Sequence, residues 1–362
     1  MKILIINSVC GIRSTGRIAA DIAEQYIANG HTCVIAYGRE FVPEKYQSIS
    51  YRISSETSVK WNALKARLFD NEGMNAESAT KRFLKWANNY DPDVLWLHNL
   101  HGYYINIELL FQWIKSRPNM QVRWTLHDCW AFTGHCAHFS FVKCDSWKEG
   151  CRHCPQKHTY PKSIFFDNSK IAYERKRKAF CGVKNMTLIT PSHWLADLTR
   201  QSFLKDYPVE VHYNTVDTEC FRPTPGNFRE KTGLTDRKII LGVASAWNER
   251  KGLGDFIKLA DMLGTDYAVV LVGLERAPSD KIICIPKTDS KRELAEIYTA
   301  ADVFVNLTYE DTYPTVNLEA QACGTPCLTY NTGGSVESVP SDNIVEQKDL
   351  YAIMNKIKSM IG

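Results

Sequence analysis

The sequence is short of several features that would assign it to common protein classes. Its 362 residues contain no apolar run of about 18 residues, so no segment is long enough to cross a bilayer. Internal repeats and low-complexity segments are absent. The net charge of +4 is too small a basic surplus to indicate nucleic-acid binding. No Gly-x-Gly-x-x-Gly fingerprint follows the first predicted strand, which argues against a dehydrogenase.

The length and composition are those of a globular enzyme of about two domains, with 44% apolar and 23% charged residues. The segment Met1–Asn7 lacks the length and cleavage region of a signal peptide and is predicted to be a buried strand. Twelve cysteines without an export signal predict reduced thiols in a cytoplasm, or metal ligands. We therefore expect a cytoplasmic protein, either free or at the inner face of the membrane.

The first half alternates predicted strands with predicted helices, which favours a parallel α/β sheet. A helix is expected from about Gly16 to Asn29, closed by Gly30, because its apolar residues recur at helical spacing. The predicted strands are Ile3–Ile6, Thr32–Ala36, Val94–Leu97, Val122–Leu126 and Thr187–Thr190.

A second alternating set follows a linker marked by Pro223, Pro225 and Gly226. Its predicted strands are Ile239–Ala244, Ala268–Val272, Ile282–Pro286, Val303–Leu307 and Pro326–Thr329. The predicted organisation is a first domain over residues 1–215 with a Cys/His-rich insert at 129–158, a second domain over 216–347, and a C-terminal helix in 348–362.

The segment Tyr309–Pro326 carries the most specific signal. Seven residues separate Asp311 from Glu319, and Pro314 opens a predicted helix that ends near Gly324. The preceding strand is apolar, and ligands of parallel sheets bind beyond the carboxyl ends of strands. Free N–H groups at a helix N-terminus suit phosphates, and carboxylates can accept hydrogen bonds from sugar hydroxyls.

This segment resembles the donor-sugar motif of glycosyltransferase family 4, and Tyr213–Pro223 is similar to the family's interdomain connection, with Thr215 in place of a Gly. The resemblance implies a GT-B fold, with two Rossmann-like domains whose parallel sheets face each other across a cleft. It implies retaining transfer of a sugar from a nucleoside diphosphate to an acceptor hydroxyl, as in bacterial polysaccharide biosynthesis. It also implies that the terminal helix, Lys348 to Met360, crosses back to the first domain.

The segment Val243–Gly252 resembles the family's diphosphate-binding loop. Lys251 is retained, whereas the family's Arg five residues earlier is Ala246, so Arg250 is the candidate for the second cation. Cations at this place stabilise the negative charge that develops on the leaving diphosphate, without a metal ion. An exposed basic helix start is the alternative interpretation.

The resemblance assigns further donor contacts. Glu319 would bind ribose hydroxyls, and backbone groups near Lys287 and Leu294 would bind the base. Asp311 would bind the transferred sugar, with Glu310 as its substitute if the turn is shifted. The backbone groups expected to contact the same sugar belong to Thr312, Tyr313, Pro314 and Thr315.

On the acceptor side, the loop Gly11–Arg17 follows the first strand, so Gly16 permits close approach while Arg13 or Arg17 binds an acceptor phosphate. An ordinary turn is an equal alternative. His127 occupies the position where the family places a catalytic His, and Asp128 is expected to orient it.

His98 and His101 also follow a predicted strand and are candidates for acceptor binding. A structural role is the alternative for all three histidines.

The insert contains a cysteine spacing typical of zinc sites, Cys151-x2-Cys154. With Cys136 and Cys144 it offers four thiolates for a structural zinc that would pin a segment with little apolar core. Disulfides, an iron–sulfur cluster and free thiols remain alternatives. No cofactor is expected to be required for catalysis.

The segment Val59–Phe69 is predicted to be a basic amphipathic helix, with Trp61, Leu64 and Leu68 on one face. Such helices can lie in a membrane interface, where a lipid-linked acceptor would be found. Packing of this face into the protein is the alternative. For the whole chain, two competing functions stay open, a nucleotide-sugar epimerase on the same fold and a non-catalytic sugar- or lipid-binding protein.

Overall fold

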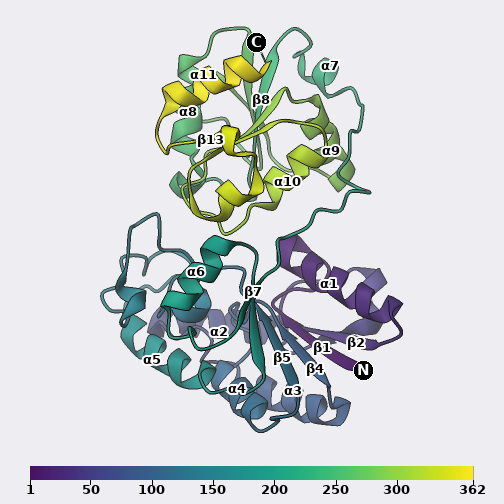
Figure 1. Cartoon of the computed structure of the whole chain (residues 1–362), viewed down its shortest axis with the longest axis vertical. Coiled ribbons are helices and arrows are strands. Elements are labelled where there is room, and N and C mark those ends of the chain that lie inside the picture. The colour runs from purple at the N-terminus through teal and green to yellow at the C-terminus, as the bar shows by residue number, and fades with distance from the viewer. Residues whose placement is uncertain (362) are drawn as a thin grey trace. The chain divides into compact units, whose positions relative to one another are not determined.

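The computed structural model describes residues 1–361, and the chain divides into two compact units with the boundary between His212 and Tyr213. The division falls three residues before the boundary predicted from the sequence. Each unit is built on a parallel sheet with helices on both faces (Figure 1). The predicted α/β class with two Rossmann-like domains is confirmed.

The sheet of the first unit has seven parallel strands in the order β3-β2-β1-β4-β5-β6-β7. The strands are β1 (Lys2–Asn7), β2 (Thr32–Tyr37), β3 (Ser50–Arg52), β4 (Val94–Leu97), β5 (Gln121–Thr125), β6 (Met186–Thr190) and β7 (Val209–Val211). The helices are α1 (Arg13–Ala28), α2 (Glu56–Phe69), α3 (Glu77–Tyr90), α4 (Ile107–Lys115), α5 (Ser169–Phe180) and α6 (His193–Gln201).

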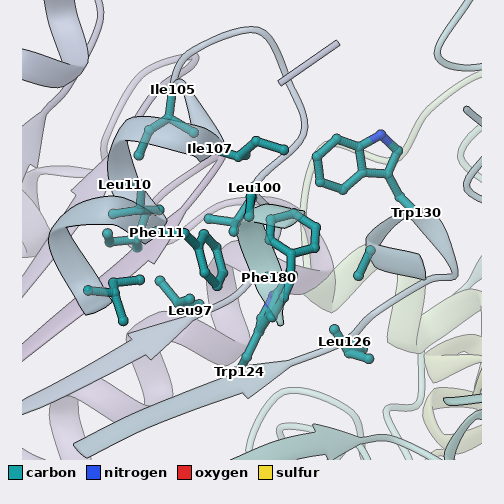
Figure 2. Packing of buried hydrophobic residues seen from close by; sticks show 14 of the residues in the cluster. Leu97, Leu100, Ile105, Ile107, Leu110, Phe111, Trp124, Leu126, Trp130 and Phe180 are labelled. Atoms are coloured by element: carbon teal, nitrogen blue, oxygen red, sulfur yellow. The ribbon is translucent and has the colours of Figure 1, made fainter. Parts of the chain in front are cut away.

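Both faces of this sheet are covered, so β4 is apolar at every position and β1 is apolar from Ile3 to Ile6. In β1, Ile3 and Ile5 join one buried cluster while Leu4 and Ile6 join the other, because successive side chains point to opposite faces. The larger cluster includes an aromatic group between α4, β5 and α5. Figure 2 shows Phe111, Trp124 and Phe180 packed together there, with ring centroids 4.6–5.4 Å apart.

The second sheet has six parallel strands in the order β10-β9-β8-β11-β12-β13. The strands are β8 (Lys238–Val243), β9 (Tyr267–Val272), β10 (Ile282–Ile285), β11 (Val303–Asn306), β12 (Cys327–Tyr330) and β13 (Ile344–Val345). The helices are α7 (Phe228–Thr232), α8 (Leu253–Met262), α9 (Lys291–Ala300), α10 (Thr315–Ala322) and α11 (Leu350–Ile361).

The terminal helix α11 packs on the second unit. Its Ile353, Ile357 and Ile361 are buried in a cluster with side chains of α8, β11 and β12. The expectation from the family resemblance was that this helix returns to the first domain. The apolar stripe of α11 is instead buried against the sheet of its own unit.

The insert at 129–158 also differs from expectation, because it has an apolar core. Phe132, Phe139 and Trp147 are buried, and their ring centroids lie 4.9–6.4 Å from one another. Its regular structure is limited to two 3₁₀ turns, η2 (Trp130–Phe132) and η3 (Ser146–Lys148). The expectation of little apolar core is therefore wrong.

Removing the buried side chain of Ile357 tests the packing of α11. We expect Ile357→Ala to lower the free energy of unfolding of the second unit by about 2–5 kcal/mol, because the substitution leaves a cavity in a closed core. Urea unfolding followed by circular dichroism measures this change. Tyr351→Ala on the same helix is the control; Tyr351 is 71% exposed, so little change is expected. Equal effects of the two substitutions would contradict this packing.

Candidate active site

Two loops at the carboxyl end of the second sheet meet through their backbones. One follows β8 and contains the 3₁₀ turn η4 (Glu249–Lys251), and the other lies between β11 and α10. Tyr309 N donates to Arg250 O over 2.8 Å. Gly252 has φ +75°, and a Cβ at this position would lie 2.1 Å from Leu307 O. A glycine is thus required both by the backbone conformation and by the closeness of the second loop.

This contact brings the two main donor-site candidates together. Lys251 Nζ lies 2.7 Å from Asp311 Oδ2, and both side chains are about one-fifth exposed. The side-chain oxygen of Asn248 accepts a hydrogen bond from Lys251 N and so caps the short turn. The Arg250 guanidinium donates to Glu310 O over 2.8 Å. A lysine, an arginine and a carboxylate therefore converge at one loop pair.

The neighbouring acidic candidates differ in their surroundings. The side chain of Glu310 is buried, whereas Asp311 faces Lys251, so the structure favours Asp311 over Glu310 as the accessible carboxylate. Asp311 O accepts from Gly334 N, and a Cβ on Gly333 would lie 2.2 Å from the same oxygen. The segment after β12 therefore also holds this turn in place.

Helix α10 begins at Thr315, directly after Pro314, and places Glu319 at its middle. Tyr298 of α9 donates to Glu319 Oε2 over 3.1 Å, and burial raises the pKa of Tyr298 well above its usual value, with Glu319 adding to the effect. Leu294 lies on α9, one turn before Tyr298, and is half-buried. The contact of Tyr298 with Glu319 was not predicted. The sequence feature that could have indicated it is the position of this tyrosine in the helix after the expected base-binding loop.

Thr312 and Tyr313 are buried in the turn between Asp311 and α10. The ring of Tyr313 stacks on that of Tyr213 at 5.1 Å, and Tyr313 O accepts from the amide of Asn214 over 3.2 Å. The connecting segment at the start of the second unit thus packs on the predicted sugar-binding turn. Ala246, where the family has an arginine, is exposed.

In the first unit, the three candidate histidines lie beyond β4 and β5. His98 pairs with His127, and His101 pairs with Asp128. His98 Nδ1 and His127 Nε2 are 2.9 Å apart. His101 Nε2 lies 2.9 Å from Asp128 Oδ2, and its Nδ1 lies 2.9 Å from the Tyr160 hydroxyl. The printed hydrogen bond of Asp128 to a histidine is with His101, and the charge of Asp128 also acts on His127, so the orienting role of Asp128 stays a prediction.

The two pairs have different charge environments. Burial lowers the pKa of His127 to about 4, with His101 adding to the decrease and Asp128 opposing it. Burial, then His127, lowers the pKa of His98 well below its usual value. Burial alone would raise the pKa of Asp128, but the charge and hydrogen bond of His101 lower it to about 2. His98 and His127 are therefore neutral imidazoles at neutral pH.

The glycine-rich loop after β1 is shaped by close packing. Gly11 has φ +69°, and a Cβ there would lie 2.4 Å from the ring of Tyr46; a Cβ on Gly16 would lie 2.9 Å from Val9. Arg13 forms an ion pair with Glu40, with Nε 2.9 Å from Oε1. Arg17 lies at the start of the second turn of α1 and is half-buried. Arg13 is thus already neutralised by a neighbour.

The cysteines of the insert are only partly gathered. The Cys136 thiol hydrogen-bonds Cys154, which lowers the pKa of Cys154 to about 7, and Gly134 N donates to Cys151 Sγ over 3.1 Å. All twelve cysteines are free thiols. Within residues 1–361, no group of three or more His, Cys, Asp or Glu side chains is arranged to hold a metal ion. The zinc site stays a prediction.

Comparison with known proteins places this geometry in context. The model of the family "Glycosyl transferases group 1" matches residues 226–361, which lie in the second unit. Over 351 residues the chain is 23% identical to a protein of Escherichia coli (strain K12) named as a colanic acid biosynthesis glycosyl transferase, WcaC; the match covers 93% of this chain and 85% of that protein.

Two solved structures share the fold at low sequence identity. Sucrose-phosphate synthase from Thermosynechococcus elongatus has a TM-score of 0.65 at 16% identity, covering 99% of this chain and 89% of its own. The Anabaena protein HepE in complex with UDP-glucose has a TM-score of 0.63 at 13% identity, covering 100% and 90%. These neighbours establish a shared two-domain architecture over the whole chain.

The histidine pair predicts a pH dependence of stability. Between pH 6.5 and 4 the unfolded His127 binds a proton that the native residue does not, so the free energy of unfolding falls as pH decreases through this range. We expect His127→Gln to make this decrease shallower in urea unfolding at pH 7 and pH 5. His193→Gln, at an exposed histidine, is the control. An unchanged pH slope in His127→Gln would contradict the burial of a neutral ring.

Proposed function

We propose that this chain is a glycosyltransferase that moves a sugar from a nucleoside diphosphate to an acceptor hydroxyl; the family model over residues 226–361 and the likeness to the colanic acid protein support the proposal. One observation carries the proposal: Lys251, Arg250 and Asp311 converge at the carboxyl ends of β8 and β11. A Lys and an Arg at this place suit a diphosphate, and a carboxylate beside them suits a sugar hydroxyl. The Anabaena neighbour that contains UDP-glucose supports a uridine donor.

In the proposed reaction, the bond between the anomeric carbon and the diphosphate oxygen breaks, and negative charge develops on the leaving group. Lys251 and Arg250 stabilise that charge in a partly dehydrated loop, where a fixed cation is worth more than in water. Asp311 and the backbone of residues 312–315 bind the sugar, while Glu319 binds ribose hydroxyls.

We further propose retention of anomeric configuration, with the departing diphosphate accepting the proton of the incoming hydroxyl. This step follows from the family resemblance. The proposed step does not use the two catalytic carboxylates of glycoside hydrolases.

For the first unit we propose acceptor recognition beyond β4 and β5. His127 is the catalytic candidate there; its Nε2 contacts His98 Nδ1, and the ring is a neutral imidazole, which donates one hydrogen bond and accepts one. His101 contacts the neighbouring Asp128. The likeness to the colanic acid protein favours a glycan acceptor in bacterial polysaccharide biosynthesis. Residues 1–361 contain no helix long and apolar enough to span a bilayer.

Donor binding is tested first by thermal shift with nucleoside diphosphates and their sugars. A ligand that binds only the folded protein raises the melting temperature. At a ligand concentration one hundred times the dissociation constant, the folded state is stabilised by about 2.7 kcal/mol. The expected result is a shift with a nucleoside diphosphate and with its sugar. No shift with any base would contradict the donor assignment.

The role of Lys251 is tested by removing its charge. We expect Lys251→Ala to lower the rate of nucleoside diphosphate release with donor and glycan acceptor by about 100-fold or more, because the developing charge loses its nearest cation. Lys258→Ala is the matched control, since Lys258 is a 70% exposed lysine on α8. Equal rates for Lys251→Ala and the unmodified enzyme would contradict the site.

Incubation of the enzyme with nucleotide-sugars alone distinguishes transfer from epimerisation. Transfer requires an acceptor, so the sugar should keep its configuration when none is present. An epimerised nucleotide-sugar formed without acceptor would instead support an epimerase on the same fold.

The insert carries a separate proposal, a structural zinc held by Cys136, Cys144, Cys151 and Cys154. The contact between Cys136 and Cys154 supports it, whereas the described arrangement lacks a third converging ligand. Metal analysis of gently purified protein is expected to give one zinc per chain and a lower melting temperature after chelation. A zinc content well below one per chain would contradict this proposal.

A further inference from the structure

Large apolar side chains are exposed together on two segments of the first unit. Trp61 is 59% exposed and Phe165 is 67% exposed. We call the following six residues the aromatic patch: Trp61, Leu64, Phe69, Ile164, Phe165 and Phe166. Three belong to α2 and three to the loop 160–168 before α5. Contiguous exposed apolar surface is unfavourable in water and marks an interaction site.

The two segments form one surface. Ile164 N donates to Arg67 O over 2.7 Å, and the Asn168 amide donates to Phe69 O over 2.7 Å. The rings of Phe69 and Phe166 stack with centroids 6.1 Å apart and planes at 19°. The loop is therefore fixed against the C-terminal end of α2, where Phe69 and Phe166 adjoin.

Helix α2 packs on the protein through the face opposite Trp61 and Leu64. Its buried positions are Asn62 and Ala66. The Asn62 amide donates to Tyr103 O over 3.1 Å, so a polar contact ties the helix to the protein. Trp61 and Leu64 point outward instead, contrary to the alternative in which this face packs inward.

The charges around the patch are cationic. Each acidic side chain of the two segments has a partner within the protein: Glu56 pairs with Arg52, Asp70 with His135, and Asp167 accepts from Ser169 and Cys154 N. The exposed cations on the same segments form no ion pair with acidic side chains in the described part of the chain. They are Lys60, Lys65, Arg67 and Lys162.

This combination favours a bilayer over a protein partner. Protein interfaces are depleted in lysine, whereas aromatic side chains bordered by Lys and Arg suit the boundary between headgroups and acyl chains. Cations near an anionic leaflet are attracted to it, and their long stems let the charge reach the headgroups while the apolar part stays buried.

The patch is also connected to the acceptor side of the proposed site. The loop that carries Phe165 and Phe166 begins at Tyr160, whose hydroxyl lies 2.9 Å from His101 Nδ1. His101 in turn contacts Asp128, next to His127. One loop therefore joins the exposed apolar surface to the predicted acceptor residues.

We propose that the aromatic patch docks the first unit on a membrane surface rich in anionic lipid. The second part of the proposal rests on the proposed function: the acceptor is lipid-linked and is taken from that membrane surface. Docking itself requires no donor, so it can be measured independently of the transfer reaction.

Co-sedimentation of the full chain with vesicles tests the proposal. We expect binding to vesicles of phosphatidylglycerol and phosphatidylcholine, weaker binding to phosphatidylcholine alone, and loss of binding to the mixed vesicles at high salt. The double variant Phe165→Ser/Phe166→Ser should bind at least tenfold more weakly. Lys60→Gln/Lys65→Gln should reduce the preference for anionic vesicles.

Matched controls are Phe41→Ser in the first unit and Tyr351→Ser in the second. Phe41 is 69% exposed and Tyr351 is 71% exposed, and both lie outside the patch. These variants should bind vesicles like the unmodified protein. The melting temperature of each variant shows whether that variant is folded. The shift of this temperature by a nucleoside diphosphate distinguishes a failure of docking from a failure of donor binding.

Three results would overturn the proposal. The first is no binding to either vesicle type, and the second is equal loss of binding in the patch and control variants. The third is concentration-dependent self-association without lipid that Phe165→Ser/Phe166→Ser abolishes, which would assign the patch to a second copy of the chain.

Discussion

The close approach of two loops at the carboxyl end of the second sheet determines the rest of the candidate donor site. Gly252 leaves no room for a Cβ against Leu307 O, and Tyr309 N bonds Arg250 O, so the backbones are in contact before any side chain is considered. The Lys251–Asp311 ion pair is a consequence of that contact. A larger residue at 252 would separate the loops, and with them the cation and the carboxylate that the proposed chemistry requires.

The first unit uses a different constraint, the burial of imidazoles beside one another. A charged ring at His98 or His127 would be desolvated and would face a second ring, so both are neutral. His101 instead contacts a carboxylate. Neighbouring histidines at the ends of two strands thus differ in what they offer to a ligand. A neutral pair can both donate and accept hydrogen bonds, and the His101–Asp128 pair is already satisfied internally.

The sequence predicted the central strands within one or two residues, because strands buried on both faces are continuous apolar runs. The edge strands β3, β7 and β13 were missed; each has two or three residues and no fully buried position. The positions of Lys251 and Asp311 followed from the motif, but their contact did not, since it depends on the separation of two loops 60 residues apart. The contact between Asp128 and His101 could not be predicted, because the two residues lie 27 positions apart and follow different strands. In the insert, the cysteine spacing drew attention away from the aromatic residues that form its core.

The absence of an arginine at position 246 becomes understandable from the environment of Arg250. The guanidinium has five N–H donors, and the bond to Glu310 O uses one of them. That bond holds the side chain against the loop after β11, next to Lys251, so less conformational entropy is lost when it binds an anion than for a free arginine. An arginine at 246 would extend from an exposed position and would have to be ordered by the ligand itself. In the proposed site, Arg250 is therefore the candidate for the second cation, one residue from Lys251, whereas the related motif places an arginine five residues before the lysine.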